Sequence, residues 1–337
     1  MRKKERKKIK GRKGKLDVQV LGMALDLEID FRFDGRESGT PCLLCHGWPD
    51  DSRTWDYLVG VLVEKGFRCA RYDLPWYGSS HDALQRGELK GYSKWGYNFD
   101  EVADALARAV ERTWEGEPVL VIAHDWGAYH AEFLLDRHPE VVARCVLMDV
   151  MMGSMQPNLA ILYQPFLLGV LYQYRQMFAF AIANAFPSFA NYLASGSAEY
   201  MRSMAVQGAA EQHRDLCQDK NADTLALSGY PYYYWHRNFF LTMVGVTSKY
   251  NLSWFKKEDA PPVLLIFGER KPFPFHSRAI ANALNEGKVG GTGSKSVGLP
   301  CGHWVQLELA ARCAEVVCDW LVQTGASGWG GAGRSRI

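Results

Sequence analysis

The sequence predicts an α/β protein built on a mostly parallel, eight-stranded sheet with helices on both faces and an inserted helical cap. Strand-like runs alternate with helical segments over most of the 337 residues, which is typical of a parallel sheet covered on both sides. One long stretch, residues 151–245, interrupts this alternation with tyrosine, phenylalanine, methionine and alanine at helical spacing. A chain of this length suits one large domain that carries an insert.

The predicted strands and helices follow one another in a regular order. The first two strands have no helix between them, so we expect antiparallel strands at one edge of the sheet. The predicted strands are Leu16–Leu21, Leu25–Phe33, Pro41–Cys45, Phe67–Tyr72, Val119–Ala123, Ala143–Val150, Pro262–Phe267 and Ser294–Leu299. The predicted helices are Tyr97–Trp114, Ala128–Arg137, Ser277–Leu284 and Ala310–Val322.

The insert defines the predicted domain organisation. Residues 16–150 and 246–323 are expected to form the core, and residues 151–245 the helical cap. Ligands of such sheets bind at the carboxyl edge of the strands. The cap is therefore expected to cover that edge and to enclose a small hydrophobic substrate.

Both ends of the chain differ from the body in composition. Residues 1–15 hold ten lysines and arginines and one glutamate, so the rest of the chain carries −7 of the overall net charge of +2. A block of like charge favours a disordered tail. It could be an address, a membrane-surface or nucleic-acid contact, or a solubilising extension, and nucleic-acid binding would rest on it alone. Residues 324–337 are glycine-rich and are expected to be flexible.

Cysteine usage and targeting signals bear on the compartment. The eight cysteines fit neither a zinc site nor a disulfide framework, which favours reduced thiols in the cytoplasm. The basic tail lacks the apolar region of a secretory signal, and no run approaches the roughly 20 apolar residues of a membrane span. The chain ends in Ser335-Arg336-Ile337, a weak three-residue match to the peroxisomal Ser-Lys-Leu signal.

One segment predicts a nucleophile. Val119–Ala128 combines an apolar strand, a sharp turn and the start of a helix, and Asp125 stands between the small residues Ala123 and Gly127 in the pattern of a nucleophile elbow. A carboxylate is ionised at neutral pH and can attack an sp³ carbon that bears a leaving group, with an ester as the intermediate. Epoxides and haloalkanes are such substrates. The alternative is that Asp125 only caps the helix.

A second loop is predicted to stabilise the negative charge that develops when such an ester is hydrolysed. A buried apolar run leads into His46-Gly47-Trp48-Pro49, in which Gly47 permits close backbone approach and Pro49 stiffens the turn, with a cis peptide as one form of it. The backbone N–H groups of Trp48 and Trp126 are the predicted oxyanion hole. His46 is expected to hold the loop by hydrogen bonds and not to act as a base.

The predicted general base is a histidine near the C-terminus. Gly302-His303-Trp304 follows the last predicted strand and precedes the last predicted helix. The chain order, with the histidine after the nucleophile, fits the elbow motif. We expect His303 to accept a proton from the water that hydrolyses the ester. The alternative is a histidine that serves the core or caps a helix.

These residues resemble the α/β-hydrolase superfamily, and within it the branch of epoxide hydrolases and haloalkane dehalogenases. The resemblance covers about residues 16–322 and implies the fold and an Asp nucleophile, but it is much less specific for the substrate. The matching segments are His46-Gly47-Trp48-Pro49, Asp73-Leu74-Pro75-Trp76-Tyr77-Gly78, His124-Asp125-Trp126-Gly127 and Gly302-His303-Trp304.

The acid that orients the histidine departs from the usual pattern of this family. Its members usually carry Asp a few residues after a glycine that ends the penultimate strand, and here Lys271 fills that position. A cation cannot stabilise an imidazolium. Some dehalogenases of the family place the acid after the strand that follows the elbow helix, where this chain has Asp149. The resemblance therefore implies Asp149 as the acid, with Glu269 as the alternative; Asp149 could instead be a turn residue.

The cap is expected to supply acids to the leaving group. Epoxide hydrolases use two cap tyrosines for this purpose, and the resemblance implies Tyr172 as the first. The second matching segment contains Tyr234 and His236, with His236 where a tyrosine is expected. Tyr232, Tyr233 or Tyr234 could replace that tyrosine, as could a protonated His236.

The sequence therefore predicts a hydrolase that uses water as co-substrate, and neither a metal nor a cofactor motif is present. Epoxide hydrolysis to a diol is the leading hypothesis. Haloalkane dehalogenation is the second, although Trp48 stands where dehalogenases often carry a halide-binding Asn. A catalytically silent ligand-binding homologue is the third, because of Lys271. The sequence does not indicate an oligomeric state.

Overall fold

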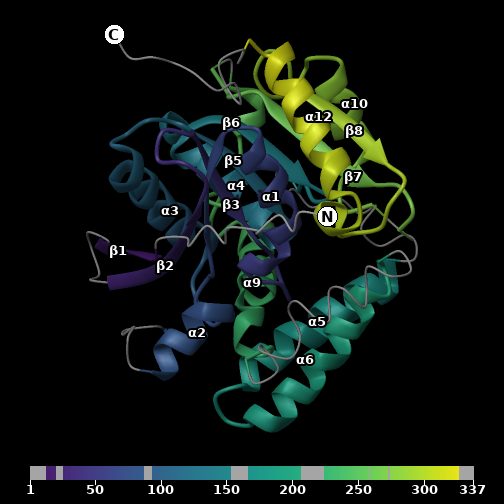
Figure 1. Ribbon diagram of the computed structural model, residues 1–337. Coiled ribbons are helices and arrows are strands. Elements are labelled where there is room, and N and C mark those ends of the chain that lie inside the picture. The colour runs from purple at the N-terminus through teal and green to yellow at the C-terminus, as the bar shows by residue number, and fades with distance from the viewer. Residues whose placement is uncertain are drawn as a thin grey trace, which may run out of the picture.

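An eight-stranded sheet forms the centre of the molecule (Figure 1). The computed structural model describes residues 13–19, 26–86, 93–152, 166–205, 224–257, 259–271 and 274–325. The strand order is β1-β2-β4-β3-β5-β6-β7-β8; β2 pairs antiparallel with β1 and β4, and the other pairs are parallel. The predicted fold class is confirmed. The strands are β1 (Lys13–Gln19), β2 (Asp26–Asp34), β3 (Thr40–Cys45), β4 (Phe67–Tyr72), β5 (Val119–His124), β6 (Val142–Met148), β7 (Val263–Gly268) and β8 (Lys295–Leu299).

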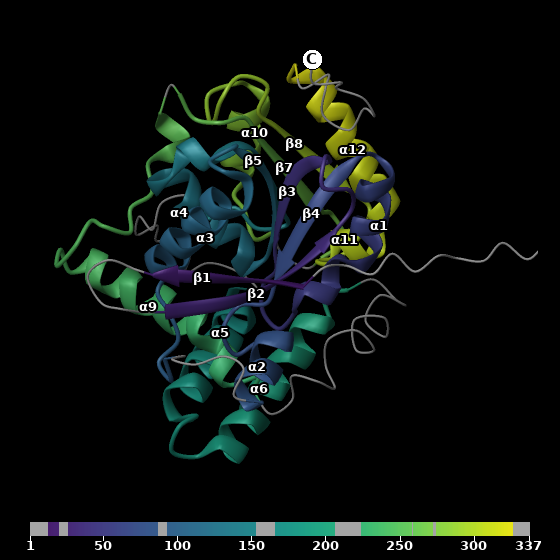
Figure 2. The ribbon, with the colours of Figure 1, turned by 60° about the vertical axis from the view of Figure 1, so that its left-hand side comes forward.

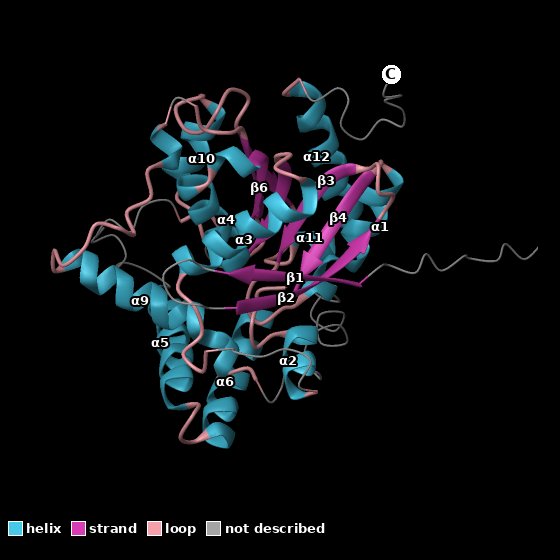
Figure 3. Ribbon diagram, turned by 90° about the vertical axis from the view of Figure 1, so that its left-hand side faces the viewer, coloured by secondary structure: helices cyan, strands magenta, loops and turns pink. Residues whose placement is uncertain are grey.

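Helices cover both faces of the sheet because its central strands are apolar on both sides. Figure 3 shows α3 and α4 on one face and α1 and α12 on the other. In β5, Val121 and Ala123 belong to the core beneath α3 and α4, whereas Leu120 and Ile122 belong to the core beneath α1 and α12. The helices of the two layers are α1 (Asp56–Glu64), α3 (Phe99–Trp114), α4 (Trp126–Arg137), α10 (Arg278–Asn285), α11 (Val305–Glu308) and α12 (Ala310–Gln323).

The start of α3 shows how local sequence sets a helix boundary. The Asn98 side chain accepts a hydrogen bond from Phe99 N (2.9 Å), and the Glu101 carboxylate accepts one from Asn98 N (2.8 Å). Such a capping box stabilises a helix by about 1 kcal/mol. The helix therefore begins two residues after its predicted start. Helices α1 and α2 (Gly78–Gln85) lie outside the predicted elements.

The helical insert lies at the carboxyl edge of the parallel strands. Its described helices α5 (Phe166–Ile182), α6 (Pro187–Arg202) and α9 (Tyr230–Met243) pack together below the sheet in Figure 1. Hydrogen bonds join the insert to the core; among them, Trp48 Nε1 donates to Leu225 O (3.2 Å), and Tyr77 Oη donates to Ser228 O (2.5 Å). None of the helices in the described ranges has the length and apolarity to cross a membrane.

The N-terminal strand corrects one expectation. Residues 13–15 fall within the predicted disordered tail, yet they open β1, which pairs with β2 from Lys13↔Arg32 to Gln19↔Asp26 (Figure 2). The backbone ladder with β2 overrides the unfavourable charge composition of this stretch. Residues 1–12 and 326–337 lie outside the described residues, so Ser335-Arg336-Ile337 stays untested.

Gly127 allows α4 to pack against the end of β3. A Cβ atom at position 127 would lie 2.3 Å from Cys45 O and 2.5 Å from His46 O, both backbone atoms of a buried strand end. Gly60, in α1, has open space where its Cβ would be. The two glycines thus respond to the same substitution in opposite ways.

We predict that Gly127→Ala lowers the free energy of unfolding by about 3 kcal/mol, because the backbone of β3 must move to admit the methyl group. Gly60→Ala should raise that free energy by about 0.5–1 kcal/mol, because alanine is the better helix former. Urea denaturation of both variants measures the difference. Equal stability of Gly127→Ala and the parent protein would contradict the close packing at the elbow.

Candidate active site

Asp125 occupies a strained turn between β5 and α4. Its φ of 54° and ψ of −127° lie in a region that non-glycine residues avoid, at a cost of about 1–3 kcal/mol. The residue is 6% exposed, and Trp48 N donates a hydrogen bond to Asp125 Oδ1 (2.9 Å). The turn holds one carboxylate at the carboxyl edge of the sheet and at the N-terminal end of α4, where the helix dipole favours an anion.

Gly47 permits the loop of residues 46–49, called the oxyanion loop below for its predicted role, to approach the turn at Asp125 closely. A Cβ at position 47 would lie 2.3 Å from Asp125 Oδ1 and 2.7 Å from Trp126 N. The Trp48–Pro49 peptide is cis, the form that the sequence analysis allowed for. The two predicted oxyanion donors, Trp48 and Trp126, therefore flank Gly47, and Trp48 N already binds Asp125.

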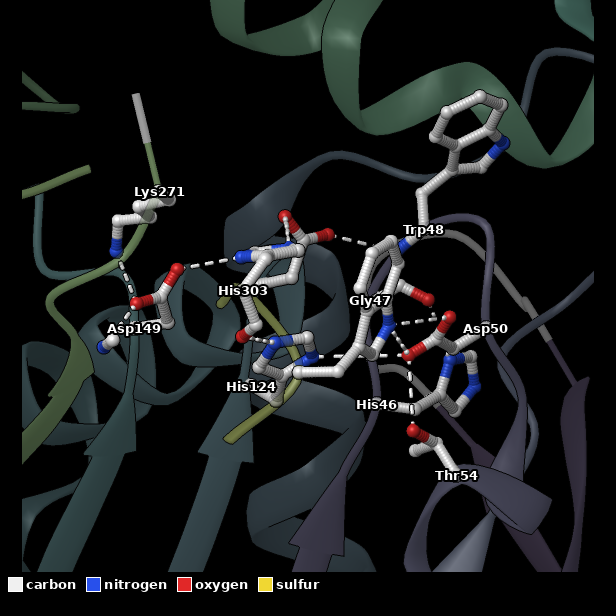
Figure 4. A network of polar contacts seen from close by, with 12 residues as sticks. His46, Gly47, Trp48, Asp50, Thr54, His124, Asp149, Lys271 and His303 are labelled. Carbon is white, nitrogen blue, oxygen red and sulfur yellow. Dashed lines mark hydrogen bonds and ion pairs between the residues drawn. The ribbon is translucent and has the colours of Figure 1, made fainter. Parts of the chain in front are cut away.

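His303 lies between two buried carboxylates. Its Nδ1 donates to Asp149 Oδ2 (2.6 Å), and its Nε2 lies 3.6 Å from Asp125 Oδ2. The His303 side chain is fully buried. The backbone is held as well, because His303 N donates to Met204 O in the insert (3.2 Å) and His303 O lies 3.0 Å from His124 Nε2. Figure 4 shows His303 directly above His124 and facing Asp149.

Asp149, and not Glu269, is the carboxylate that meets the histidine. Asp149 follows β6 with a φ of 67°, and its Oδ1 accepts hydrogen bonds from Gly268 N (2.9 Å) and Lys271 Nζ. Glu269 is exposed, and its carboxylate lies over Gly298 on β8. Lys271 thus occupies the position that the family pattern gives to an acid, and its ammonium group contacts the acid that stands elsewhere (Figure 4).

The two carboxylates control the charge of the imidazole. Burial by itself disfavours a charged His303, but the nearby carboxylates of Asp125 and Asp149, the latter hydrogen-bonded to Nδ1, outweigh it and raise the pKa of His303 from 6.5 to about 9. Burial likewise opposes ionisation of Asp149, but the Lys271 charge and the His303 hydrogen bond hold its pKa far below the usual value. At neutral pH the resting site therefore contains an imidazolium flanked by two carboxylates.

His46 supports the loop, as predicted from the sequence. Its Nε2 accepts a hydrogen bond from Leu74 N (3.0 Å), which leaves the proton on Nδ1 to bond Gly47 O (3.0 Å). Nearby, Asp50 is buried and accepts hydrogen bonds from Trp304 Nε1 (2.9 Å) and Thr54 Oγ1 (3.0 Å). These contacts join the oxyanion loop to the segment that carries His303.

Two tyrosines of the insert lie near Asp125. The Tyr232 ring centroid is 4.8 Å from that of Trp126 and 5.9 Å from that of Tyr172. Burial, together with the negative charge of Asp125, raises the pKa of both phenols, so both remain protonated at neutral pH. Tyr172 was predicted from the sequence, whereas Tyr232 was named only as a substitute.

The structure does not bring Tyr234 and His236 to this position. Tyr234 packs on Tyr233, with ring centroids 5.4 Å apart, and His236 stacks on Tyr174 at 4.5 Å. Burial lowers the pKa of His236 to about 4, so it is a poor proton donor at neutral pH. All five residues from 232 to 236 belong to α9, whose rotation places Tyr232 alone against Trp126. Because residues 232–236 are all aromatic, their sequence does not show which of these side chains faces Trp126.

Comparison with known proteins identifies the class of this protein. The family model of the alpha/beta hydrolase fold matches residues 40–309, and the chain therefore belongs to this family and is a hydrolase enzyme. The haloalkane dehalogenase DbeA-M1 loop variant from Bradyrhizobium elkanii has the same fold, with a TM-score of 0.63, 17% identity, and coverage of 94% of this chain and 99% of that one.

Two curated relatives share shorter segments with the chain. The epoxide hydrolase srdG of Neurospora crassa is 35% identical over 101 residues, which are 30% of this chain and 27% of that protein. EphD of Mycobacterium tuberculosis, an oxidoreductase by its name, is 33% identical over 127 residues, which are 37% of this chain and 20% of that protein. The matches thus span about a fifth to a quarter of these relatives' length.

We predict that Asp125→Asn lowers the pKa of His303 by at least about one unit, because one of the two flanking charges is lost. In the parent protein the raised pKa should keep His303 protonated up to about pH 9, whereas an ordinary histidine loses its proton near pH 6.5. Titration by ¹⁵N NMR of the labelled imidazoles measures both values. His138, which pairs with Asp104 elsewhere, provides the internal control; an unchanged pKa of His303 would contradict its contact with Asp125.

Proposed function

We propose that this hydrolase opens epoxides to diols with the carboxylate of Asp125 as nucleophile and His303 as the base that activates water. The observation that carries the proposal is the line Asp125–His303–Asp149, with a buried tyrosine pair near its free end. A serine would require deprotonation before attack, whereas this nucleophile is anionic from the start. The substrate is a small hydrophobic epoxide, because the surrounding side chains are mainly aromatic.

In the first step, Asp125 Oδ2 attacks an oxirane carbon while the bond from that carbon to the ring oxygen breaks. The product is an ester on Asp125 and an alkoxide on the neighbouring carbon. Tyr172 or Tyr232 donates a proton to this oxygen, which turns a poor leaving group into a hydroxyl. Asp125 Oδ1, which accepts the hydrogen bond of Trp48 N, becomes the ester carbonyl oxygen.

In the second step, water attacks the ester carbonyl carbon. Esterification removes the negative charge of Asp125, so the pKa of His303 falls and its proton passes, directly or through water, to the tyrosinate left by the first step. The free Nε2 can then accept the proton of the attacking water. Asp149 holds the imidazolium that forms, and the N–H groups of Trp48 and Trp126 stabilise the oxyanion. The tetrahedral intermediate collapses by breaking the bond from the carbonyl carbon to the diol oxygen, which takes the proton of His303. The carboxylic acid left on Asp125 then returns its proton to His303, which restores the resting ion pair.

Haloalkane dehalogenation is the second candidate, and one observation favours it. Trp126, the residue after Asp125, is buried, and its indole Nε1 makes no hydrogen bond to the described residues. A halide leaving group could accept that hydrogen bond, and the same ester would follow. Halide release from a haloalkane without epoxide turnover would support this candidate. Ligand binding without turnover of either substrate would support a silent homologue.

We predict that the parent enzyme converts styrene oxide to the diol and that Asp125→Ala lowers the rate by roughly 10³-fold or more, because the covalent step is lost. Asp82→Ala, at an exposed position of α2, is the matched control and should retain full activity.

In H₂¹⁸O over many turnovers, heavy oxygen should enter the Asp125 carboxylate, as peptide mass spectrometry measures. His303→Gln should accumulate the ester as an added substrate mass. Undiminished turnover in Asp125→Ala would refute the mechanism.

We predict that the double variant Tyr172→Phe, Tyr232→Phe slows ester formation by roughly 10²–10⁴-fold, since no acid then protonates the alkoxide. Tyr234→Phe is the control, because that ring packs against Tyr233 instead. Single-turnover kinetics of ester formation in a His303→Gln background isolates this step. If Tyr234→Phe slows the step as much as the double variant does, the assignment of the donors fails.

A further inference from the structure

Lys271 forms a buried ion pair with the acid of the proposed triad. Its side chain is 1% exposed and that of Asp149 is fully buried. Taking an ammonium and a carboxylate out of water is costly unless each finds a partner. In the sequence, Lys271 argues for a catalytically silent homologue, because a cation stands where the family usually has an acid. In the structure this cation contacts Asp149 on the side away from His303.

The contacts divide the two oxygens of Asp149 between different partners. Oδ1 accepts from Lys271 Nζ and Gly268 N (2.9 Å), whereas Oδ2 accepts from His303 Nδ1 (2.6 Å). This division fixes the rotation of the carboxylate about its Cβ–Cγ bond. Lys271 therefore helps to aim Oδ2 at the imidazole.

Phe275 covers this arrangement. Lys271 Nζ lies 5.4 Å from the centroid of the Phe275 ring, and the same ring makes an edge contact with His303 at 5.2 Å. An aromatic ring over the cation excludes water, and the interaction between the charges is screened less than at a surface. The charge of Lys271 therefore acts strongly on Asp149, and through Asp149 it can influence His303.

Few other groups near the pair are charged at neutral pH. Burial lowers the pKa of both His124 and His276 to about 4 and raises that of Cys301 to about 12, so all three are neutral. The titratable groups that face Asp149 or His303, or act on them through space, are Asp125, His124, Lys271, His276, Cys301 and Asp50.

The charge balance changes when Asp125 becomes an ester. With Lys271 present, the remaining cluster of Asp149, Lys271 and His303 is positive when the imidazole is protonated and neutral when it is not. Without Lys271 the cluster would be neutral when the imidazole is protonated and negative when it is not. A buried site disfavours net charge, so the lysine favours release of the imidazole proton at the stage where His303 must act as a base.

We propose that Lys271 is a positioning residue that aims the Asp149 carboxylate at His303 and neutralises its charge, so that His303 becomes a base once Asp125 is esterified. This inference rests on the proposed function for its catalytic meaning. Its structural content, the influence of Lys271 on His303, can be measured without any substrate.

The test compares Lys271→Met, Lys271→Gln and Lys271→Arg in an Asp125→Asn background, in which the charge of residue 125 is absent as it is in the ester. Titration by ¹⁵N NMR should show the pKa of His303 higher by about 1–2 units in the Met and Gln variants than in the background alone. The Arg variant keeps the charge and should restore the background value. Lys288→Met, at an exposed position, should change nothing.

The Gln variant retains a hydrogen-bond donor, so it separates the effect of charge from that of contact and offers a second chance of a folded protein. Equal pKa values of His303 in the Gln, Arg and background proteins would overturn the proposal. When the Met and Gln substitutions of Lys271 are made with Asp125 intact, the acid limb of the pH–rate profile for ester hydrolysis should move to higher pH by the same shift. The rate of ester formation should be unchanged. If no epoxide is turned over at all, the proposed function fails, but the NMR comparison still decides the role of Lys271.

Discussion

Two carboxylates buried on either side of one imidazole are the interaction on which the rest of this structure depends. Removing each carboxylate from water costs free energy, and one imidazolium can balance the charge of only one of them. The fold meets this cost with backbone donors and one lysine: Trp48 N binds Asp125, while Gly268 N and Lys271 bind Asp149. Trp48 follows β3, whereas Gly268 ends β7 and Lys271 follows it, so only the assembled sheet can bring these donors together.

The parallel sheet makes this convergence possible because its central strands all end at one edge. The loops there must nevertheless approach more closely than side chains permit. Gly47 lies against the Asp125 carboxylate, and Gly268 lies against Gly302, where a Cβ would come within 1.8 Å of a carbonyl oxygen. Asp125 and Asp149 both adopt positive φ angles to point into the gap. The strain at these two acids is borne by the two well-packed cores beneath them.

The sequence predicted the parts of the site that have short-range signatures. Asp125 and Trp48 lie in motifs whose small residues report a tight backbone, and His303 follows from chain order. The resemblance favoured Asp149 over Glu269, and in the structure Asp149 is buried and hydrogen-bonded to His303, whereas Glu269 is exposed. Tyr232 could not be selected from its neighbours, since the phase of α9 depends on its packing against the core. The strand pairing of Lys13 was hidden by its basic surroundings.

The arrangement also explains why a carboxylate nucleophile suits a base with a raised pKa. In the resting site Asp125 is part of the reason why His303 is protonated, and a protonated imidazole cannot activate water. In the proposed mechanism, formation of the ester removes the charge of Asp125, so His303 becomes a base only when an ester is present to be hydrolysed. At that stage the negative charge of Asp149, if nothing balanced it, would still favour the protonated form of His303. Lys271 contacts Asp149 on the side away from His303, and in the proposed role its positive charge weakens this effect without moving the carboxylate.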